Sequence, residues 1–255
     1  MLGELYKPKG LARETAKAVL ETENVYACNM AFGCTNRCRY CYVPRFTHRK
    51  KDQDIRLPKK SPVELVLNQL EHRWKFHWTQ REELGVFLSF LTDPFLPECG
   101  DESEKLIEAL IRSRIHVATL SKLSTSVHHG VRQGMTIVSL DEKFHKKWEP
   151  FTCPVEGRLV ILKTCKKEFG DYVWISMEPY PPSAIYKQDF DSLLEELNFV
   201  DLIVFGKWNY DKRANTEEAR QEYKNYIGIL EDFCRSNYIR YHVKSDTMNF
   251  VFNMC

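Results

Sequence analysis

The residues with the clearest chemistry are three cysteines in the segment Cys34-Thr-Asn-Arg-Cys38-Arg-Tyr-Cys41, whose spacing is C-x3-C-x2-C. A structural zinc site typically has four ligands in two separated pairs. The sequence has no second C-x2-C pair, and neither His48 nor Cys28 has the usual spacing of a fourth ligand. Three cysteines instead leave one iron of a [4Fe–4S] cluster open, which is typical of catalysis. An iron–sulfur cluster is therefore the favoured interpretation and zinc the alternative.

The remaining cysteines bear on the cellular compartment. The chain holds nine cysteines in 255 residues, and an odd number cannot all form disulfides. Residues 1–20 carry charges and no apolar core of a signal peptide, so we expect a cytoplasmic protein with reduced thiols. No apolar run approaches the roughly 18 residues that a transmembrane helix needs, so we expect no membrane association. The six cysteines outside the array show no clustered spacing that would predict a second cluster.

Strand and helix signals alternate along the rest of the chain and must position these cysteines. Apolar or aromatic runs predict strands at residues 25–30, 86–91, 116–121, 136–140, 172–177, 202–206 and 239–243. Helical spacing lies between them, at residues 62–74, 103–113, 155–169, 190–197 and 216–234. Uniformly apolar strands are typical of buried parallel sheets. We therefore expect an α/β fold: a partial (β/α)6 TIM-like barrel with parallel strands, formed by residues 23–255 as one domain behind an N-terminal extension at residues 1–22.

The predicted strands end on polar or charged groups, and parallel barrels carry their chemistry at these carboxyl ends. Three lysines facing three carboxylates in one mouth would hold a zwitterionic cofactor by charge-assisted hydrogen bonds. The six residues are Lys122, Lys207 and Lys244 against Asp93, Glu178 and Asp246. Solvent also begins at strand ends, so a plain surface role is an equal alternative for any single position.

The cysteine array, with an aromatic residue before its last cysteine, resembles that of the radical S-adenosylmethionine (SAM) superfamily. Other segments are similar to the DNA-repair-photolyase-like subgroup, which is related to spore photoproduct lyase. These segments are Ser89-Phe-Leu-Thr-Asp-Pro-Phe-Leu-Pro-Glu98, Leu140-Asp-Glu, Trp148-Glu-Pro150, Arg158-Leu159 and Met177-Glu-Pro-Tyr-Pro-Pro182. The array is specific for the superfamily, whereas the other motifs say little about the substrate.

The resemblance implies an oxygen-sensitive enzyme of lyase or transferase type. Cys34, Cys38 and Cys41 match the cluster ligands, and SAM binds the open iron. One electron, from a donor such as flavodoxin or ferredoxin, cleaves SAM to methionine and a 5′-deoxyadenosyl radical, which abstracts hydrogen from the substrate.

The resemblance also implies contacts to SAM. Tyr40 matches the aromatic residue near the adenine, and Lys122 resembles the lysine that pairs with the SAM carboxylate. Thr92 and Asp93 stand where the superfamily contacts the amino group, although the usual Gly-Gly-Glu-like sequence is absent. Ser139 resembles the position that contacts the ribose.

A hydrogen donor is a separate question. Spore photoproduct lyases carry a donor cysteine just ahead of their Thr-Ser-Asp segment, where this chain has Phe90-Leu91. We therefore expect that this chain does not use that donor. Cys153, in Phe151-Thr-Cys-Pro154, is the candidate for returning a hydrogen atom to a product radical.

Charge bears on the substrate. With 37 basic and 35 acidic residues, 37 − 35 gives a net charge of +2, which excludes a module that is basic throughout. Residues 45–60 are locally basic with interleaved aromatics, and such a stretch can follow a phosphate backbone and stack bases; a solvated loop is the alternative. We expect a radical SAM enzyme that repairs or modifies nucleic acid. The alternatives are a radical SAM enzyme for a peptide or small metabolite and a zinc-stabilised, non-catalytic nucleic-acid-binding protein.

Overall fold

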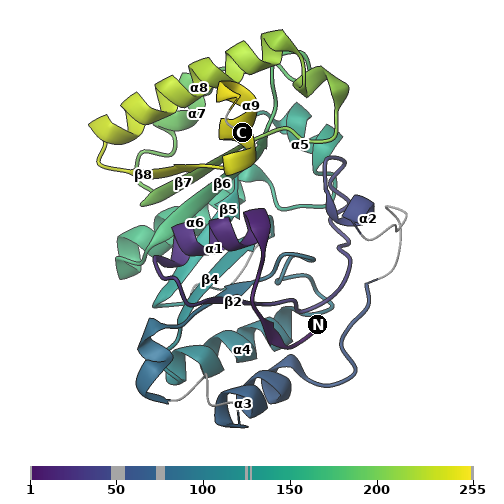
Figure 1. Cartoon of the computed structure of the whole chain (residues 1–255), viewed down its shortest axis with the longest axis vertical. Helices are drawn as coiled ribbons and strands as arrows, with labels where there is room; N and C mark the ends of the chain where they lie inside the picture. Colours follow the sequence, from purple (N-terminus) through teal and green to yellow (C-terminus); the bar gives the residue numbers. More distant parts are fainter. Residues whose placement is uncertain (1, 47–54, 73–77, 124–125, 127, 254–255) are drawn as a thin grey trace.

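A single open sheet organises the fold (Figure 1). The structure is a computed structural model that describes residues 2–46, 55–72, 78–123, 126 and 128–253. The strands lie side by side in chain order: β1 (Leu5–Tyr6), β2 (Val25–Cys28), β3 (Gly85–Leu88), β4 (His116–Ser121), β5 (Val131–Thr136), β6 (Val173–Tyr180), β7 (Leu202–Lys207) and β8 (Arg240–Val243). β1 is antiparallel to β2, and β2 to β8 are parallel. Because no pairing joins β8 to β1 within the described residues, the barrel is partial and open, as the sequence predicts.

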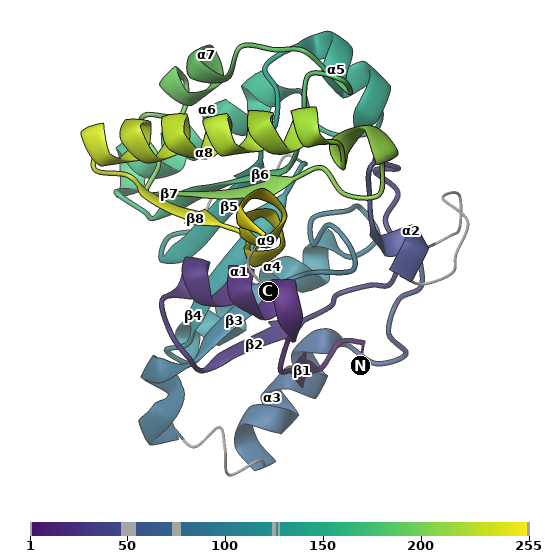
Figure 2. The same cartoon turned by 45° about the horizontal axis from the view of Figure 1, so that its top comes forward.

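Helices cover the outer face of the sheet in two groups (Figures 1 and 2). The α-helices of the described residues are α1 (Gly10–Leu20), α2 (Val43–Phe46), α3 (Pro62–His72), α4 (Gly100–Arg112), α5 (Glu142–Trp148), α6 (Val155–Phe169), α7 (Phe190–Glu195), α8 (Glu217–Ser236) and α9 (Ser245–Phe252). Buried apolar residues of α3 and α4 form one core with β2 to β4, and those of α6, α7 and α8 form another with β5 to β7. None of the helices in this part of the chain is long and apolar enough to cross a membrane.

α1 occupies the inner face of the sheet, between β2 and β8 in both views (Figures 1 and 2). Ala16, Val19 and Leu20 of α1 are buried in one cluster with Phe87 of β3 and Trp174 of β6. Burial of this apolar stripe explains why a short helix with several charged residues is stable here. The sequence predicts no helix or strand within residues 1–22, so the structure adds β1 and α1 to the predicted elements.

Polar contacts tie α1 to the end of β8. Lys244 donates from Nζ to the Leu11 carbonyl at 2.8 Å and to Thr15 Oγ1 at 2.6 Å. The Glu14 carboxylate lies 2.7 Å from His242 Nε2 and accepts hydrogen bonds from the backbone N and the hydroxyl of Ser245, the first residue of α9. These bonds fix the N-terminal half of α1 against the carboxyl end of the sheet.

One predicted strand is misplaced. The sequence predicts a strand at residues 136–140, whereas β5 spans Val131–Thr136. The observed strand contains Arg132, Gln133 and Gly134, which weaken its apolar signal, while the residues that follow it are apolar. Gly134 is required because Trp174 of β6 lies against it: a Cβ at this position would lie 2.2 Å from the indole ring.

Candidate active site

The cysteine array forms the loop after β2, at the edge where the parallel strands end. Asn29, which follows β2 directly, accepts hydrogen bonds at Oδ1 from Ser89 Oγ and from the backbone N of Phe90 and Leu91, at 3.2, 3.0 and 3.2 Å. Gly33 has φ of 101°, a conformation that favours glycine, and donates from its backbone N to the Leu91 carbonyl. The loop after β3 therefore fixes where the array begins.

The three cysteine thiols are neighbours within this loop. Cys38 is buried, and Cys34 and Cys41 are half-buried. Burial raises the pKa of Cys34 to about 11, with smaller contributions from the charges of Asp93 and Cys41. Burial also raises the pKa of Cys38, and the charges of Cys41 and Cys34 add to that shift. Ionising all three thiols together therefore requires a compensating cation, which an iron–sulfur cluster provides.

The three thiols belong to one loop, but their sulfurs are not arranged as metal ligands. Across the described ranges, no three His, Cys, Asp or Glu side chains meet the geometry of a metal site. By chemistry the donor set still fits an iron–sulfur cluster, whose irons are held by thiolates.

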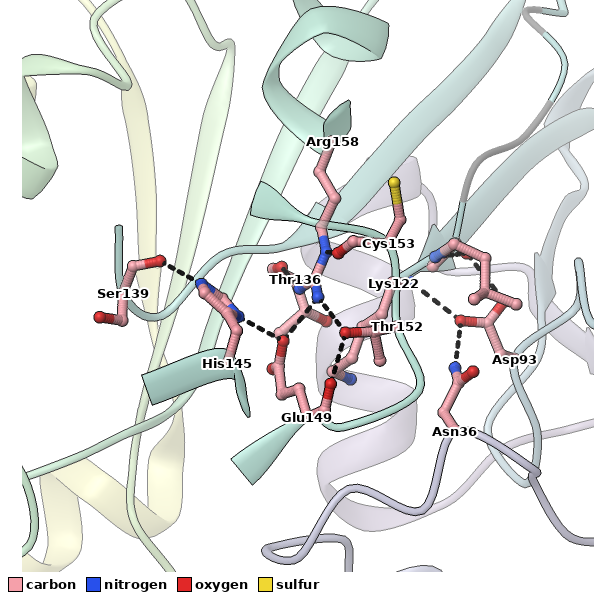
Figure 3. Close-up of polar contacts among 12 residues, drawn as sticks. Asn36, Asp93, Lys122, Thr136, Ser139, His145, Glu149, Thr152, Cys153 and Arg158 are labelled. Carbon is pink, nitrogen blue, oxygen red and sulfur yellow. Dashed lines mark hydrogen bonds and ion pairs between the residues drawn. The ribbon is translucent and has the colours of Figure 1, made fainter. Parts of the chain in front are cut away.

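Asp93 connects the cysteine loop to β3 and β4 (Figure 3). Its Oδ1 accepts hydrogen bonds from Ser121 Oγ at 2.8 Å and from the backbone N of Phe95 at 3.1 Å. Its Oδ2 accepts from the backbone N of Lys122 at 2.8 Å and from Asn36 Nδ2 at 3.1 Å. A carboxylate offers about four lone-pair sites, and donors of the protein occupy them here. The residue predicted to contact the SAM amino group thus holds the cysteine loop in place.

Lys122 and Tyr40 meet beside Cys38. The Lys122 ammonium lies 5.7 Å from the centroid of the Tyr40 ring, within cation–π range. Burial lowers the pKa of Lys122, but the charges of Cys38 and Glu149 outweigh it and raise that pKa above its ordinary value. The Tyr40 ring also packs edge-on against Trp208, which follows β7, with centroids 5.2 Å apart. Residues that follow β2, β4 and β7 therefore meet at the Tyr40 ring, two residues after Cys38, the middle cysteine of the array.

Glu149 is the centre of a buried polar network (Figure 3). The sequence alone predicts no role for this residue. Its carboxylate accepts a hydrogen bond from the Tyr40 hydroxyl and lies 3.0 Å from His145 Nδ1 and 2.6 Å from the Arg158 guanidinium. The side chains of Glu149 and Arg158 have no exposed surface. Burial would raise the pKa of Glu149, but the His145 hydrogen bond and the charges of Arg158 and Lys122 lower it to about 2. Glu149 is therefore a fixed negative charge behind the cysteine loop.

Arg158, in the first turns of α6, satisfies the polar groups around it. Its Nε donates to the Cys153 carbonyl at 2.9 Å, and its Nη1 donates to the Thr136 carbonyl at 2.8 Å. Its Nη2 donates to Thr152 Oγ1 at 2.5 Å and pairs with Glu149. One guanidinium thereby holds the end of β5 and the loop before α6 together.

The sequence carried a signal for this network. Glu149 and Arg158 lie in motifs that contributed to the resemblance, without an assigned role. His145 precedes Glu149 by four residues, the spacing that brings two side chains together on one helix face. Its other ring nitrogen lies 2.8 Å from the Ser139 carbonyl. Only the structure shows that this pair faces Tyr40.

Two other predicted SAM contacts are buried near the strand ends. Ser139 has no exposed surface, and its hydroxyl accepts a hydrogen bond from the backbone N of Asp141 at 3.1 Å. Thr92 is buried beside Asp93, where its hydroxyl donates to the Asp93 carbonyl at 3.4 Å. Both hydroxyls support their own loops.

Cys153, the candidate hydrogen donor, lies in the loop before α6. Its backbone N donates to the Lys122 carbonyl at 2.9 Å. Figure 3 shows its sulfur directed away from Asn36 and Glu149. The sulfur lies over Gly157 of α6, where a Cβ would be only 2.8 Å away. The backbone of Cys153 thus belongs to the site, while its thiol points toward α6.

Glu178, at the end of β6, faces both α1 and the cysteine loop. Its carboxylate lies 3.7 Å from Lys244 Nζ, and its charge helps to raise the pKa of Tyr42, which follows Cys41 and is shifted chiefly by burial. Burial raises the pKa of Glu178 itself, against the opposing effect of Lys244. Gly206 of β7 leaves the space that the Glu178 side chain fills.

Lys207, at the end of β7, turns toward α9. Its ammonium donates to Asn215 Oδ1 at 3.0 Å and lies 4.9 Å from the centroid of the Phe250 ring. Burial lowers its pKa, partly offset by the charge of Asp246. The structure therefore brings Tyr40, Asp93 and Lys122 together, with Lys207 farther along the same edge of the sheet.

Two hollows open on the outer side of the cysteine loop. One, of about 410 Å³, is lined by Thr35, Asn36, Arg37, Leu96, Pro97, Leu123 and Phe151. The other, of about 430 Å³, shares Leu96 and Pro97 and extends to Asp101, Glu104 and Ser126. The residues that line them do not include the charged strand-end residues Asp93, Lys122, Glu178 and Lys207.

Much of the predicted nucleic-acid surface lies outside the described residues. Arg49, Lys50 and Lys51 fall in the range 47–54, as does the zinc-ligand candidate His48. Of the basic stretch that is described, Arg56 stacks 5.2 Å from the centroid of the Phe32 ring. Lys59 and Lys60 are exposed.

Comparisons with known proteins relate this geometry to a known fold. No protein-family model matches the sequence. A curated relative, the uncharacterised protein ORF301 of Acidianus two-tailed virus, is 29% identical over 233 residues, which cover 84% of this chain and 77% of that protein.

Solved structures give the fold. A mutant spore photoproduct lyase superposes with a TM-score of 0.57 at 14% identity, over 94% of this chain and 86% of that one. A radical SAM methyltransferase from Sphaerobacter thermophilus gives 0.56 at 13% identity, over 86% and 65%. SuiB of Streptococcus suis gives 0.54 at 11% identity, over 91% and 53%. The partial barrel predicted from the strand and helix pattern is thus a fold that this chain shares with these three structures, one of which is a radical SAM methyltransferase.

Proposed function

We propose that this protein is a radical SAM enzyme whose [4Fe–4S] cluster is held by Cys34, Cys38 and Cys41. The observation that carries the proposal is the place of the cysteine array. It follows β2 at the mouth of a partial barrel of the radical SAM type, and side chains from the ends of β3, β4 and β7 contact Asn36 and Tyr40, which lie on either side of Cys38. Bound there, the cluster would pass on the electron that cleaves SAM to methionine and a 5′-deoxyadenosyl radical, which would abstract hydrogen from the substrate.

The residues of the chain then have distinct tasks. Lys122 is a cation beside Cys38 and fits the carboxylate of SAM, and the Tyr40 ring next to it fits the adenine. Thr92 is the proposed contact to the amino group and Ser139 to the ribose, while Glu178 and Lys207 offer opposite charges along the same edge of the sheet for the zwitterionic cofactor. Asp93 fixes the loop on which these contacts depend.

The cellular setting and the substrate belong to the same proposal. We infer a cytoplasmic enzyme, formed by one domain of residues 23–255 behind the extension 1–22, that takes its electron from a donor such as flavodoxin or ferredoxin. Nucleic acid is the proposed substrate class. The support is the basic stretch 45–60, which directly follows the cysteine loop and whose described part exposes Lys59 and Lys60. Cys153 is the proposed hydrogen donor, which requires its thiol to turn from α6 toward the site.

Anaerobic reconstitution tests the cluster. We expect about four irons and four acid-labile sulfides per chain in the wild type, and loss of both in Cys34→Ala, Cys38→Ala and Cys41→Ala. Cys165→Ala is the matched control, because Cys165 is a buried thiol in α6, away from the loop. Zinc without acid-labile sulfide would overturn the proposal and favour the zinc-stabilised alternative.

A further inference from the structure

Two buried carboxylates hold the residues on either side of the middle cysteine. Asn36, two residues before Cys38, donates from Nδ2 to Asp93 Oδ2 at 3.1 Å. Tyr40, two residues after Cys38, donates its hydroxyl to Glu149. Asn36, Asp93 and Glu149 are 3%, 8% and 2% exposed, so water does not compete effectively for either bond.

The two carboxylates are themselves connected through Lys122, Cys153 and Arg158 (Figure 3). With the bonds to Asn36 and Tyr40, these contacts form a closed ring. Lys122 donates from its backbone N to Asp93 at 2.8 Å, and the Lys122 carbonyl accepts from the backbone N of Cys153 at 2.9 Å. Arg158 then donates to the Cys153 carbonyl at 2.9 Å and pairs with Glu149 at 2.6 Å. The ring passes from β3 through β4 and α6 and returns to the loop on both sides of Cys38.

The loop needs such support because regular structure does not supply it. Residues 34–41, all of them described, form turns rather than helix or strand. Their backbone bonds include one from Arg39 to the Trp148 carbonyl at 2.9 Å and one from Cys41 to the Cys38 carbonyl at 3.1 Å. Side-chain contacts therefore contribute much of the order in this segment. Cys38 is also the most buried of the three cysteines.

We propose that Asp93 and Glu149 act as a carboxylate clamp: through Asn36 and Tyr40 they hold the chain on either side of Cys38, so that the loop is ordered before the metal binds. This inference rests on the proposed function, in that the loop is taken to hold an iron–sulfur cluster. Asp93 and Glu149 are positioning residues, since they act on Cys38 through other side chains. Partners that orient metal ligands in this way typically change metal affinity about 10- to 100-fold when they are removed.

Tyr40→Phe is the gentlest probe, because it removes one hydroxyl and keeps the ring against Trp208 and Lys122. Tyr186→Phe is the matched control, since the Tyr186 hydroxyl donates to the Asp141 carboxylate outside the ring. Ile203→Val, in the outer core at β7, controls for loss of global stability. Glu149→Gln tests the carboxylate directly.

The first measurement is iron release from the reconstituted proteins under a chelator. We expect release about 10- to 100-fold faster from Tyr40→Phe and Glu149→Gln than from the wild type, and wild-type rates from Tyr186→Phe and Ile203→Val. The spectrum of the reduced cluster in electron paramagnetic resonance should shift in the first pair alone, which a purely structural role would not cause. Normal loading in the wild type with unchanged release in Tyr40→Phe would overturn the clamp and leave the proposed function standing.

The second measurement uses the apoprotein, so it does not depend on the cluster. Alkylation of Cys38, followed by mass spectrometry of the peptide, should be about tenfold faster in Tyr40→Phe than in either control variant, because the loop opens more often. Equal rates would contradict the clamp. If the wild type takes up no iron but Cys38 is still alkylated faster in Tyr40→Phe than in the controls, the cluster is rejected and the ordering of the loop is retained.

Discussion

Arg158 and Glu149 form an ion pair in which nitrogen and oxygen lie 2.6 Å apart and neither side chain has exposed surface. The pair joins α6 to the cysteine loop, because Glu149 also accepts the Tyr40 hydroxyl. Removing one partner of a fully buried pair leaves the other charge buried without a counter-charge. The free-energy cost of that unpaired charge exceeds the stabilisation that the pair itself provides.

Arg158→Met should therefore destabilise the protein by about 3–5 kcal/mol, while the double variant Arg158→Met/Glu149→Leu recovers part of that loss. Lys163→Met is the control: Lys163 and Glu196 pair at 3.3 Å with half of each side chain exposed, and such a pair contributes about 0–1 kcal/mol. Urea unfolding measures all three. If Arg158→Met and Lys163→Met lower the free energy of unfolding equally, the buried ion pair is no more important for stability than the exposed one.

Acid sensitivity follows from the same carboxylate. In the folded protein the pKa of Glu149 is about 2, against an ordinary value of 4.5. A folded pKa below the unfolded one stabilises the protein above pH 4.5, and this contribution is lost as the pH falls from 4.5 toward 2. Its full size is on the order of 3 kcal/mol. The free energy of unfolding should fall less steeply below pH 4.5 in Glu149→Gln than in the wild type; parallel slopes would exclude Glu149 as a source.

Two glycines give opposite predictions. A Cβ at Gly134 would lie 2.2 Å from the Trp174 ring, and overpacking of this kind destabilises by about 1–3 kcal/mol or more. A Cβ at Gly228, exposed on α8, meets nothing within 4 Å, so Gly228→Ala should stabilise the helix by about 0.5–1 kcal/mol. Thermal unfolding should move down for Gly134→Ala and up for Gly228→Ala. Similar midpoints for the two variants would contradict the close approach of β5 and Trp174.

The nucleic-acid hypothesis predicts a charge effect. Reversal of Arg49, Lys50 and Lys51 to glutamate should weaken binding of an oligonucleotide and reduce the salt dependence of that binding. The control variant reverses three exposed lysines elsewhere, Lys167, Lys187 and Lys224. Fluorescence anisotropy at several salt concentrations separates the two. Equal affinities and equal salt slopes would remove residues 45–60 from the proposed interface.

The sequence predicts most of the parallel sheet because buried strands are largely apolar, as in β3 and in all of β7 except its final lysine. It misses β5, since an arginine, a glutamine and a glycine interrupt that strand and only the Trp174 contact explains the glycine. It also misses α1, whose position inside the sheet depends on residues distant in sequence.

In the candidate site too, the sequence predicts some of the functional residues and not others. The cysteine array is visible because its residues are adjacent in sequence. The Glu149 network joins residues 109 positions apart, so local spacing could not reveal the Tyr40 contact. Asp93 is predicted to contact SAM, and its four hydrogen bonds from the protein add a role in holding the loop that its position at the end of a strand does not reveal.

If the loop at the mouth of the barrel holds the proposed cluster, the protein should cleave SAM reductively. Anaerobic incubation of the reconstituted protein with SAM and dithionite, followed by chromatography of the nucleosides, tests it most directly. We predict 5′-deoxyadenosine and methionine in equal amounts from the wild type and from Cys165→Ala, and neither from Cys38→Ala. No 5′-deoxyadenosine from a wild type loaded with iron and sulfide, or equal amounts from Cys38→Ala, would contradict the account.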